Sequence, residues 1–141
     1  MENRRISLNF MLSEFNYVEP EGDLLTIIQY VRTELERPIK ITDSTRTVQQ
    51  HIDIYKNLYG GNWIEKIPWG SRHLPAYAKG LRAIDFKISK EGGGYIPGEE
   101  IIPFIERGAK SIGCNVGIGV GKHFIHLDVD RKKNTSWSYD Y

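Results

Sequence analysis

The chain has 141 residues, 40% of them hydrophobic, and a formal net charge of +1 at pH 7. This length suits one domain, residues 1–141, with a core of its own. The near-neutral charge argues against a nucleic-acid binder, which would carry a concentrated basic face, and the run Arg131-Lys132-Lys133 is expected to be a solvated turn. No stretch approaches the roughly 20 apolar residues of a membrane span.

Cys114 is the only cysteine, which excludes an intramolecular disulfide and a thiolate cluster. Its neighbours Ile112, Val116 and Ile118 are apolar, so we expect an inert core thiol rather than a nucleophile. The N-terminal segment contains no apolar core of signal-peptide length. We therefore expect a protein that is made in the cytoplasm without a signal peptide.

The first half of the chain predicts two helices with a strand between them. Apolar residues recur at spacings of three and four over residues 23–36 and again over residues 47–58, which is typical of amphipathic helices. Between them, Pro38 to Thr42 alternates apolar and polar residues and predicts a short strand.

Residues 61–79 show no clean period and predict a long loop, a kind of segment that is often functional. Trp63, Trp69 and Tyr77 of this loop are candidates for lining a substrate groove. Packing of these rings into the core is the alternative.

The second half predicts a strand, a helix and a hairpin. Residues 82–88 alternate as a strand that places Asp85 on the face opposite Ile84 and Phe86. Pro97 opens a helix to about Gly108, in which Pro103 is expected to force a kink or a later start.

Residues 114–120 and 123–129 predict a terminal hairpin. This order of elements predicts an α+β domain in which helices pack on one face of an antiparallel sheet.

Three of the four histidines fall in two short fragments, Ser71-Arg72-His73 and residues 123–128. His73 from the loop, Asp85 from a strand and His126 from the last strand form a candidate metal site. Two imidazoles and a carboxylate leave one tetrahedral position open for water, as in catalytic rather than structural zinc sites. The alternatives are ordinary surface or core histidines, and an Asp85 that pairs with Arg82.

Two further residues near His126 are candidates for catalysis. Asp128 shares the face of His126 and could accept a hydrogen bond from an imidazole, which would orient that ring. His123 lies at the predicted turn and could take a proton from a metal-bound water.

These motifs together resemble the zinc D-alanyl-D-alanine carboxypeptidase family, whose fold is shared with the hedgehog signalling domain and the vancomycin-resistance dipeptidases. The matching residues are Ser71-Arg72-His73, Ala83-Ile84-Asp85 and Phe124-Ile125-His126-Leu127-Asp128. The resemblance implies a hedgehog/DD-peptidase-like fold with Zn²⁺ bound by His73, Asp85 and His126.

Two other segments extend the resemblance. Residues 41–47 resemble the segment in which the family places an arginine beside the metal, so that Arg46 would stabilise the developing oxyanion. Pairing of Arg46 with Asp43 at a helix start is the alternative. Leu8 to Phe15 resembles the N-terminal segment of small phage and bacterial members.

The chain departs from the family pattern at three places. His73 and Asp85 are twelve residues apart, farther than the family usually has them, so Leu74 to Ala78 resembles an inserted loop. The position of the catalytic base, often Glu or Asp in the family, holds His123. An asparagine that often follows the arginine segment is not evident, and His51 in that region is expected on a helix surface.

The resemblance implies a hydrolase, a zinc metallopeptidase of the D,D-carboxypeptidase or endopeptidase type that acts on peptidoglycan stem peptides. His123, or failing that Asp128, would shuttle the proton. Without a signal peptide, we expect an enzyme of cell wall degradation that acts after release, such as a phage endolysin, or a component of the virion. The alternatives are a non-catalytic zinc-stabilised binding or virion structural protein, and a metal-free domain.

Overall fold

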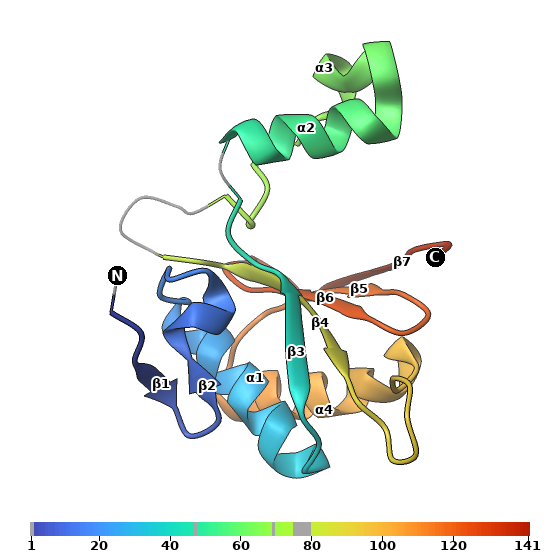
Figure 1. Cartoon of the computed structure of the whole chain (residues 1–141). Helices are drawn as coiled ribbons and strands as arrows, with labels where there is room; N and C mark the ends of the chain where they lie inside the picture. The colour runs from blue at the N-terminus through green and yellow to red at the C-terminus, as the bar shows by residue number, and fades with distance from the viewer. Residues whose placement is uncertain (1, 47, 69, 75–79) are drawn as a thin grey trace.

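The structure, a computed structural model, describes residues 2–46, 48–68, 70–74 and 80–141. The chain folds as an α+β protein, as the sequence predicts, around a five-stranded sheet with the order β3-β4-β6-β5-β7 (Figure 1). A separate sheet joins β1 and β2 near the N-terminus. The strands are β1 (Arg5–Ser7), β2 (Phe10–Met11), β3 (Ile39–Asp43), β4 (Ala83–Ile88), β5 (Gly117–Val120), β6 (Ile125–Asp128) and β7 (Thr135–Ser138).

The helices fall largely where the apolar periodicity places them. They are α1 (Gly22–Leu35), α2 (Val48–Tyr59), α3 (Trp63–Lys66) and α4 (Gly98–Ser111), with 3-10 turns η1 (Leu12–Phe15) and η2 (Gly60–Asn62). The predicted loop is therefore wrong at its start, where η2 and α3 form two short helical turns. In the part of the chain that the structure describes, no helix has the length and apolar character needed to cross a lipid bilayer.

Pro103 neither delays nor interrupts α4, which begins at Gly98 and runs to Ser111. A proline inside a helix removes one backbone hydrogen bond. Here Ile101 and Ile105 on either side of it are fully buried, and α4 packs against α1. We attribute the continuity of α4 to this packing, which offsets the lost bond.

The sheet is mixed rather than purely antiparallel, because β7 runs parallel to β5. The chain leaves β6, crosses the end of β5 and returns on its far side. Asn115 holds this crossing through hydrogen bonds from its side-chain amide to the carbonyls of Arg131 and Lys132, and Asn134 accepts a bond from the Val116 N–H. The predicted hairpin of β5 and β6 is confirmed, but the prediction that it ends the fold is wrong.

The two faces of the sheet differ in chemistry. Ile84 and Phe86 of β4 and Leu127 of β6 are fully buried in the core, on the side where α1 and α4 lie (Figure 1). Helix α2 lies on the other side of the sheet, so the predicted covering of one face holds for α1 and α4 only. Asp85 and His126 face this second side, across from α2.

Candidate metal centre

Two neighbouring strands place Asp85 and His126 side by side. Strands β4 and β6 are antiparallel, and their register sets Asp85 directly opposite His126 and Ala83 opposite Asp128. Because side chains alternate along a strand, His126 and Asp128 share one face with Asp85. The strand pairing alone therefore assembles two of the three predicted ligands.

His73 reaches the same place from the segment 70–74. Its Nδ1 lies 2.8 Å from the carbonyl oxygen of Ser44, and its own carbonyl accepts a hydrogen bond from the Arg46 N–H at 3.1 Å. Arg72 ties this segment to the end of β6, because its Nε donates to the Val129 carbonyl at 2.9 Å. These contacts hold His73, which is 3% exposed, over the sheet.

The three candidate ligand atoms have the spacing of a metal site. His73 Nε2 lies 3.3 Å from His126 Nδ1, His126 Nδ1 lies 2.9 Å from Asp85 Oδ1, and His73 Nε2 lies 3.5 Å from Asp85 Oδ1. A tetrahedral zinc ion with bonds of about 2.0–2.1 Å holds neighbouring ligand atoms roughly 3.3 Å apart. The group could therefore hold a metal ion, whose identity the spacing does not fix.

The partners of the two imidazoles set their tautomers. The Ser44 carbonyl can only accept, so His73 Nδ1 carries the hydrogen and Nε2 keeps its lone pair. His126 Nε2 lies 2.7 Å from Asp128 Oδ2, so it donates to this carboxylate and Nδ1 keeps its lone pair. When both rings are neutral, two nitrogens that carry lone pairs therefore lie 3.3 Å apart, an arrangement that a bound cation or a proton stabilises.

The carboxylates of the group stay ionised at neutral pH. Burial acts to raise the pKa of Asp85, but hydrogen bonds donated by His126 and His73 in their protonated forms outweigh burial and hold the pKa below its usual range. Burial likewise opposes ionisation of Asp128, yet hydrogen bonds from Arg131 and His126 lower its pKa to about 2. Both side chains therefore carry negative charge where a cation would bind.

His126 binds protons more tightly than an ordinary histidine does. Burial acts to lower its pKa, but hydrogen bonds to Asp128 and Asp85 outweigh burial and raise the pKa. A proton on His126 is therefore the competitor of a metal ion in this group.

Asp128 orients His126, as the sequence predicts, and is itself held by Arg131. Arg131 donates to both carboxylate oxygens, with Nη2 at 2.7 Å from Oδ2, and its guanidinium lies 5.3 Å from the centre of the Trp137 ring. The prediction of a solvated basic turn is therefore wrong for Arg131, although Lys132 and Lys133 are exposed.

Arg46 lies beside the group and is also engaged in pairing. Its Nη2 and Nε donate to Asp43 Oδ2 at 2.6 and 3.1 Å, which is the alternative expected from the sequence. Its Nη1 lies 3.3 Å from Nδ1 of His51. Arg46 nevertheless lines the cavity next to the candidate ligands.

His51 is fully buried, so its predicted place on a helix surface is wrong. Its Nε2 donates to the Pro68 carbonyl at 2.8 Å, which packs α2 onto the segment that leads to His73. The pKa of His51 is lowered, chiefly by burial and also by the positive charge of Arg46. The hydrogen bond to the Pro68 carbonyl acts in the opposite direction. His51 therefore supports Arg46 and does not belong to the ligand group.

His123 is not brought to the group. The Gly121 N–H donates to the Phe124 carbonyl at 3.0 Å, which leaves Lys122 and His123 as the two residues of the turn between β5 and β6. Both are exposed, and of this region Phe124, not His123, lines the cavity. The structure thus gives the predicted proton shuttle of His123 no support.

A cavity of about 410 Å³ lies over the candidate ligands. Its walls include aromatic side chains that the sequence reasoning missed; these are Tyr55, Phe124, Trp137, Tyr139 and Tyr141. Trp63, by contrast, is not among the residues that line this cavity. It begins α3, and the ammonium of Lys56 lies 5.1 Å from the centre of its ring. Trp69, Tyr77 and residues 75–78 of the predicted insertion lie outside the described residues.

Glycines at alternate positions of β5 make room for these walls. Gly119 is paired with His126, and a Cβ atom there would lie 2.6 Å from Tyr139 Cε2 and 2.7 Å from Trp137 Nε1. A Cβ at Gly117 would collide with Arg131 and Asp128, and one at Gly121 with the Phe124 ring. The Gly-x-Gly-x-Gly pattern of residues 117–121 was the sequence signal that large side chains pack against this strand.

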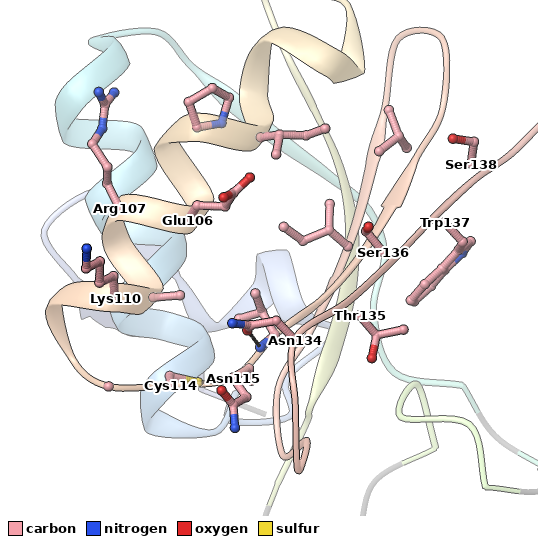
Figure 2. A pocket seen from close by; sticks show the side chains of 17 residues that line it. Glu106, Arg107, Lys110, Cys114, Asn115, Asn134, Thr135, Ser136, Trp137 and Ser138 are labelled. Atoms are coloured by element: carbon pink, nitrogen blue, oxygen red, sulfur yellow. Dashed lines mark hydrogen bonds between the residues drawn. The ribbon is translucent and has the colours of Figure 1, made fainter.

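A larger cavity of about 1060 Å³ lies between α4 and the β5–β7 edge of the sheet (Figure 2). Its lining combines apolar side chains such as Ile118 with Glu106, Arg107 and Lys110. Among its described lining residues there is no histidine, and Glu106 is the single carboxylate. The smaller cavity is therefore the candidate metal centre.

Comparisons with protein-family models, with curated proteins and with solved structures find no match for this chain. The resemblance to zinc DD-peptidases, and the finer fold that it implies, therefore stay predictions that rest on the motifs.

Cys114 is only partly buried at the edge of the core, so the expectation of a core thiol holds in part. Burial raises the pKa of its thiol to about 11, and the charge of Asp23 adds to the effect. A thiol protonated at neutral pH is a poor nucleophile, which agrees with the inert role expected from the sequence.

Proposed function

We propose that the chain is a zinc-dependent peptidase that hydrolyses peptidoglycan stem peptides, as a D,D-carboxypeptidase or endopeptidase. The observation that carries the proposal is the spacing of His73 Nε2, His126 Nδ1 and Asp85 Oδ1, which lie 2.9–3.5 Å from one another. The choice of zinc rests on this two-imidazole, one-carboxylate donor set. The choice of substrate rests on the resemblance of the motifs.

The cavity supplies what such a reaction needs around the ligands. When bound there, a zinc ion would polarise a peptide carbonyl and lower the pKa of a water molecule. Arg46 lies on the same cavity wall and would add positive charge, although its pairing with Asp43 weakens this effect. Tyr55 and Leu58 of α2 form the wall opposite the sheet and would bound the peptide on that side.

A second candidate function is a zinc-stabilised site that binds a partner, such as a virion component, without hydrolysis. One observation favours it. His123 is exposed on a turn, while both oxygens of Asp128 accept hydrogen bonds from Arg131 and one of them also from His126. Neither residue is therefore placed to move a proton in the way that the sequence predicts.

Peptide hydrolysis tests the proposed function directly. Purified peptidoglycan and a stem peptide ending in D-Ala-D-Ala are incubated with the zinc-loaded chain, and the products are identified by mass spectrometry. We expect loss of one D-Ala or cleavage at a cross-link, abolished by a chelator and in a His73→Ala variant. A chain that binds zinc and leaves both substrates intact would refute the peptidase and support the binding alternative.

A further inference from the structure

Tyr139 lies beside the candidate metal centre. It directly follows β7, which is separated from β6 by β5. Its N–H donates to the Val120 carbonyl at 2.9 Å, which continues the pairing of β7 with β5. Its ring lies over Gly119, the residue paired with His126. It lines the same cavity as Asp85 and His126.

The Tyr139 ring is held by other aromatic rings. Its centre lies 5.4 Å from that of Phe124, 5.5 Å from that of Tyr141 and 6.5 Å from that of Trp137, which stands nearly perpendicular at 79°. Such packing fixes the direction of the phenol, because a tyrosine ring has only two rotatable side-chain bonds before its hydroxyl. The hydroxyl is thus preorganised rather than loosely placed.

The phenol keeps its proton at neutral pH. Burial raises the pKa of Tyr139 above its ordinary value, and the negative charge of Asp85 adds to burial, while hydrogen bonding with Trp137 acts in the opposite direction. The Trp137 indole can only donate, so this contact uses the oxygen of Tyr139 as an acceptor. The O–H of Tyr139 remains a donor.

We propose that the Tyr139 hydroxyl donates a hydrogen bond to the carbonyl oxygen of a peptide bound at the candidate metal centre, and is a catalytic residue of the proposed peptidase. This inference rests on the proposed function. The hydroxyl keeps its proton throughout, so it stabilises the charge that develops on the oxygen without taking part in proton transfer.

Arg46, the donor that the motifs point to, is less suited to this role. Its Nε and Nη2 both donate to Asp43, and its Nη1 contacts His51. Turning the guanidinium toward a substrate would break these contacts and leave His51, which is fully buried, without its Arg46 partner. The Tyr139 O–H could donate to a substrate without breaking contacts of this kind.

The test compares Tyr139→Phe with the matched control Tyr17→Phe. Both changes remove one hydroxyl and keep the ring, but Tyr17 is 37% exposed and lies outside the cavity lining. Zinc content, thermal unfolding, kcat and KM on the stem peptide, and the calorimetric affinity for a phosphinate analogue of D-Ala-D-Ala are measured for each. The phosphinate is the probe because its tetrahedral anionic group resembles the charged state of the carbonyl.

We expect Tyr139→Phe to keep its zinc and its stability, and to lose about 10²-fold or more in kcat with little change in KM. Its phosphinate affinity should fall by a similar factor, whereas Tyr17→Phe should match the wild type in every measurement. An unchanged kcat and phosphinate affinity in Tyr139→Phe would overturn the inference.

The phosphinate measurement separates this inference from the proposed function. If the phosphinate affinity depends on Tyr139 but the zinc-loaded chain hydrolyses no peptide, the proposed peptidase activity is refuted and the hydrogen-bond donor role of Tyr139 is supported. A Tyr139→Phe variant that hydrolyses the peptide as well as the wild type does would keep the peptidase and overturn the donor role. A zinc-loaded wild type with no measurable phosphinate affinity would also overturn it.

Discussion

Asp85 and His126 are direct cross-strand partners, and Oδ1 of the carboxylate lies 2.9 Å from Nδ1 of the imidazole. The pairing of β4 with β6 therefore builds most of the candidate metal centre before His73 is added. Since the register of a buried sheet is fixed by its apolar face, here Ile84 opposite Leu127 and Phe86 opposite Ile125, the core also fixes the site.

Asp128→Asn should weaken metal binding without removing a ligand. The amide offers Nε2 of His126 a neutral acceptor in place of a carboxylate, and Arg131 loses its charged partner. Loss of such an outer partner typically lowers metal affinity about 10–100-fold, which competition with a chromogenic chelator would measure. Asp53→Asn, on the exposed surface of α2, is the control and should leave the affinity unchanged.

Gly119→Ala should destabilise the fold and disturb the cavity wall. Its Cβ would lie 2.6 Å from Tyr139 and 2.7 Å from Trp137, and both rings would have to move. Overpacking of this kind costs about 1–3 kcal/mol in the free energy of unfolding, which denaturant titration would measure. Gly22→Ala has no atom within 4 Å of the added Cβ and is the control. Equal stability of the two variants would contradict the role assigned to Gly119 in β5.

His123→Ala should leave zinc content and peptide hydrolysis unchanged. His123 is exposed on the two-residue turn between β5 and β6 and lies outside the cavity lining. The measurement is kcat/KM on the stem peptide beside the wild type. A loss of about 10²-fold or more, typical for removal of a general base, would mean that the turn moves to bring His123 to the substrate.

The alternation of β4 and the periodicity of α1 could be recognised in the sequence because each element buries one face. The same alternation set Asp85 on the face opposite Ile84 and Phe86, and Asp128 on the face of His126. The grouping of Asp85 and His126 with His73 as ligands came from the motifs and their resemblance to the family, because His73 lies in a loop without a period.

β7 and the buried position of His51 could not be predicted in the same way. Thr135–Ser138 alternates serine with threonine and tryptophan, a pattern with no apolar face of its own, and it becomes a strand only by pairing with β5. His51 is buried because the segment around Pro68 folds onto α2, a contact between residues 17 apart in the chain. Both are tertiary effects that override local pattern.

Zinc content is the measurement that tests the central claim most directly. The wild type, Asp85→Ala and His126→Ala are purified identically, supplied with zinc, dialysed and analysed by mass spectrometry of the metal. We predict about one zinc per chain in the wild type and its loss in both variants, each with the secondary structure of the wild type. A wild type that retains no zinc, or variants that retain as much as the wild type, would contradict the claim.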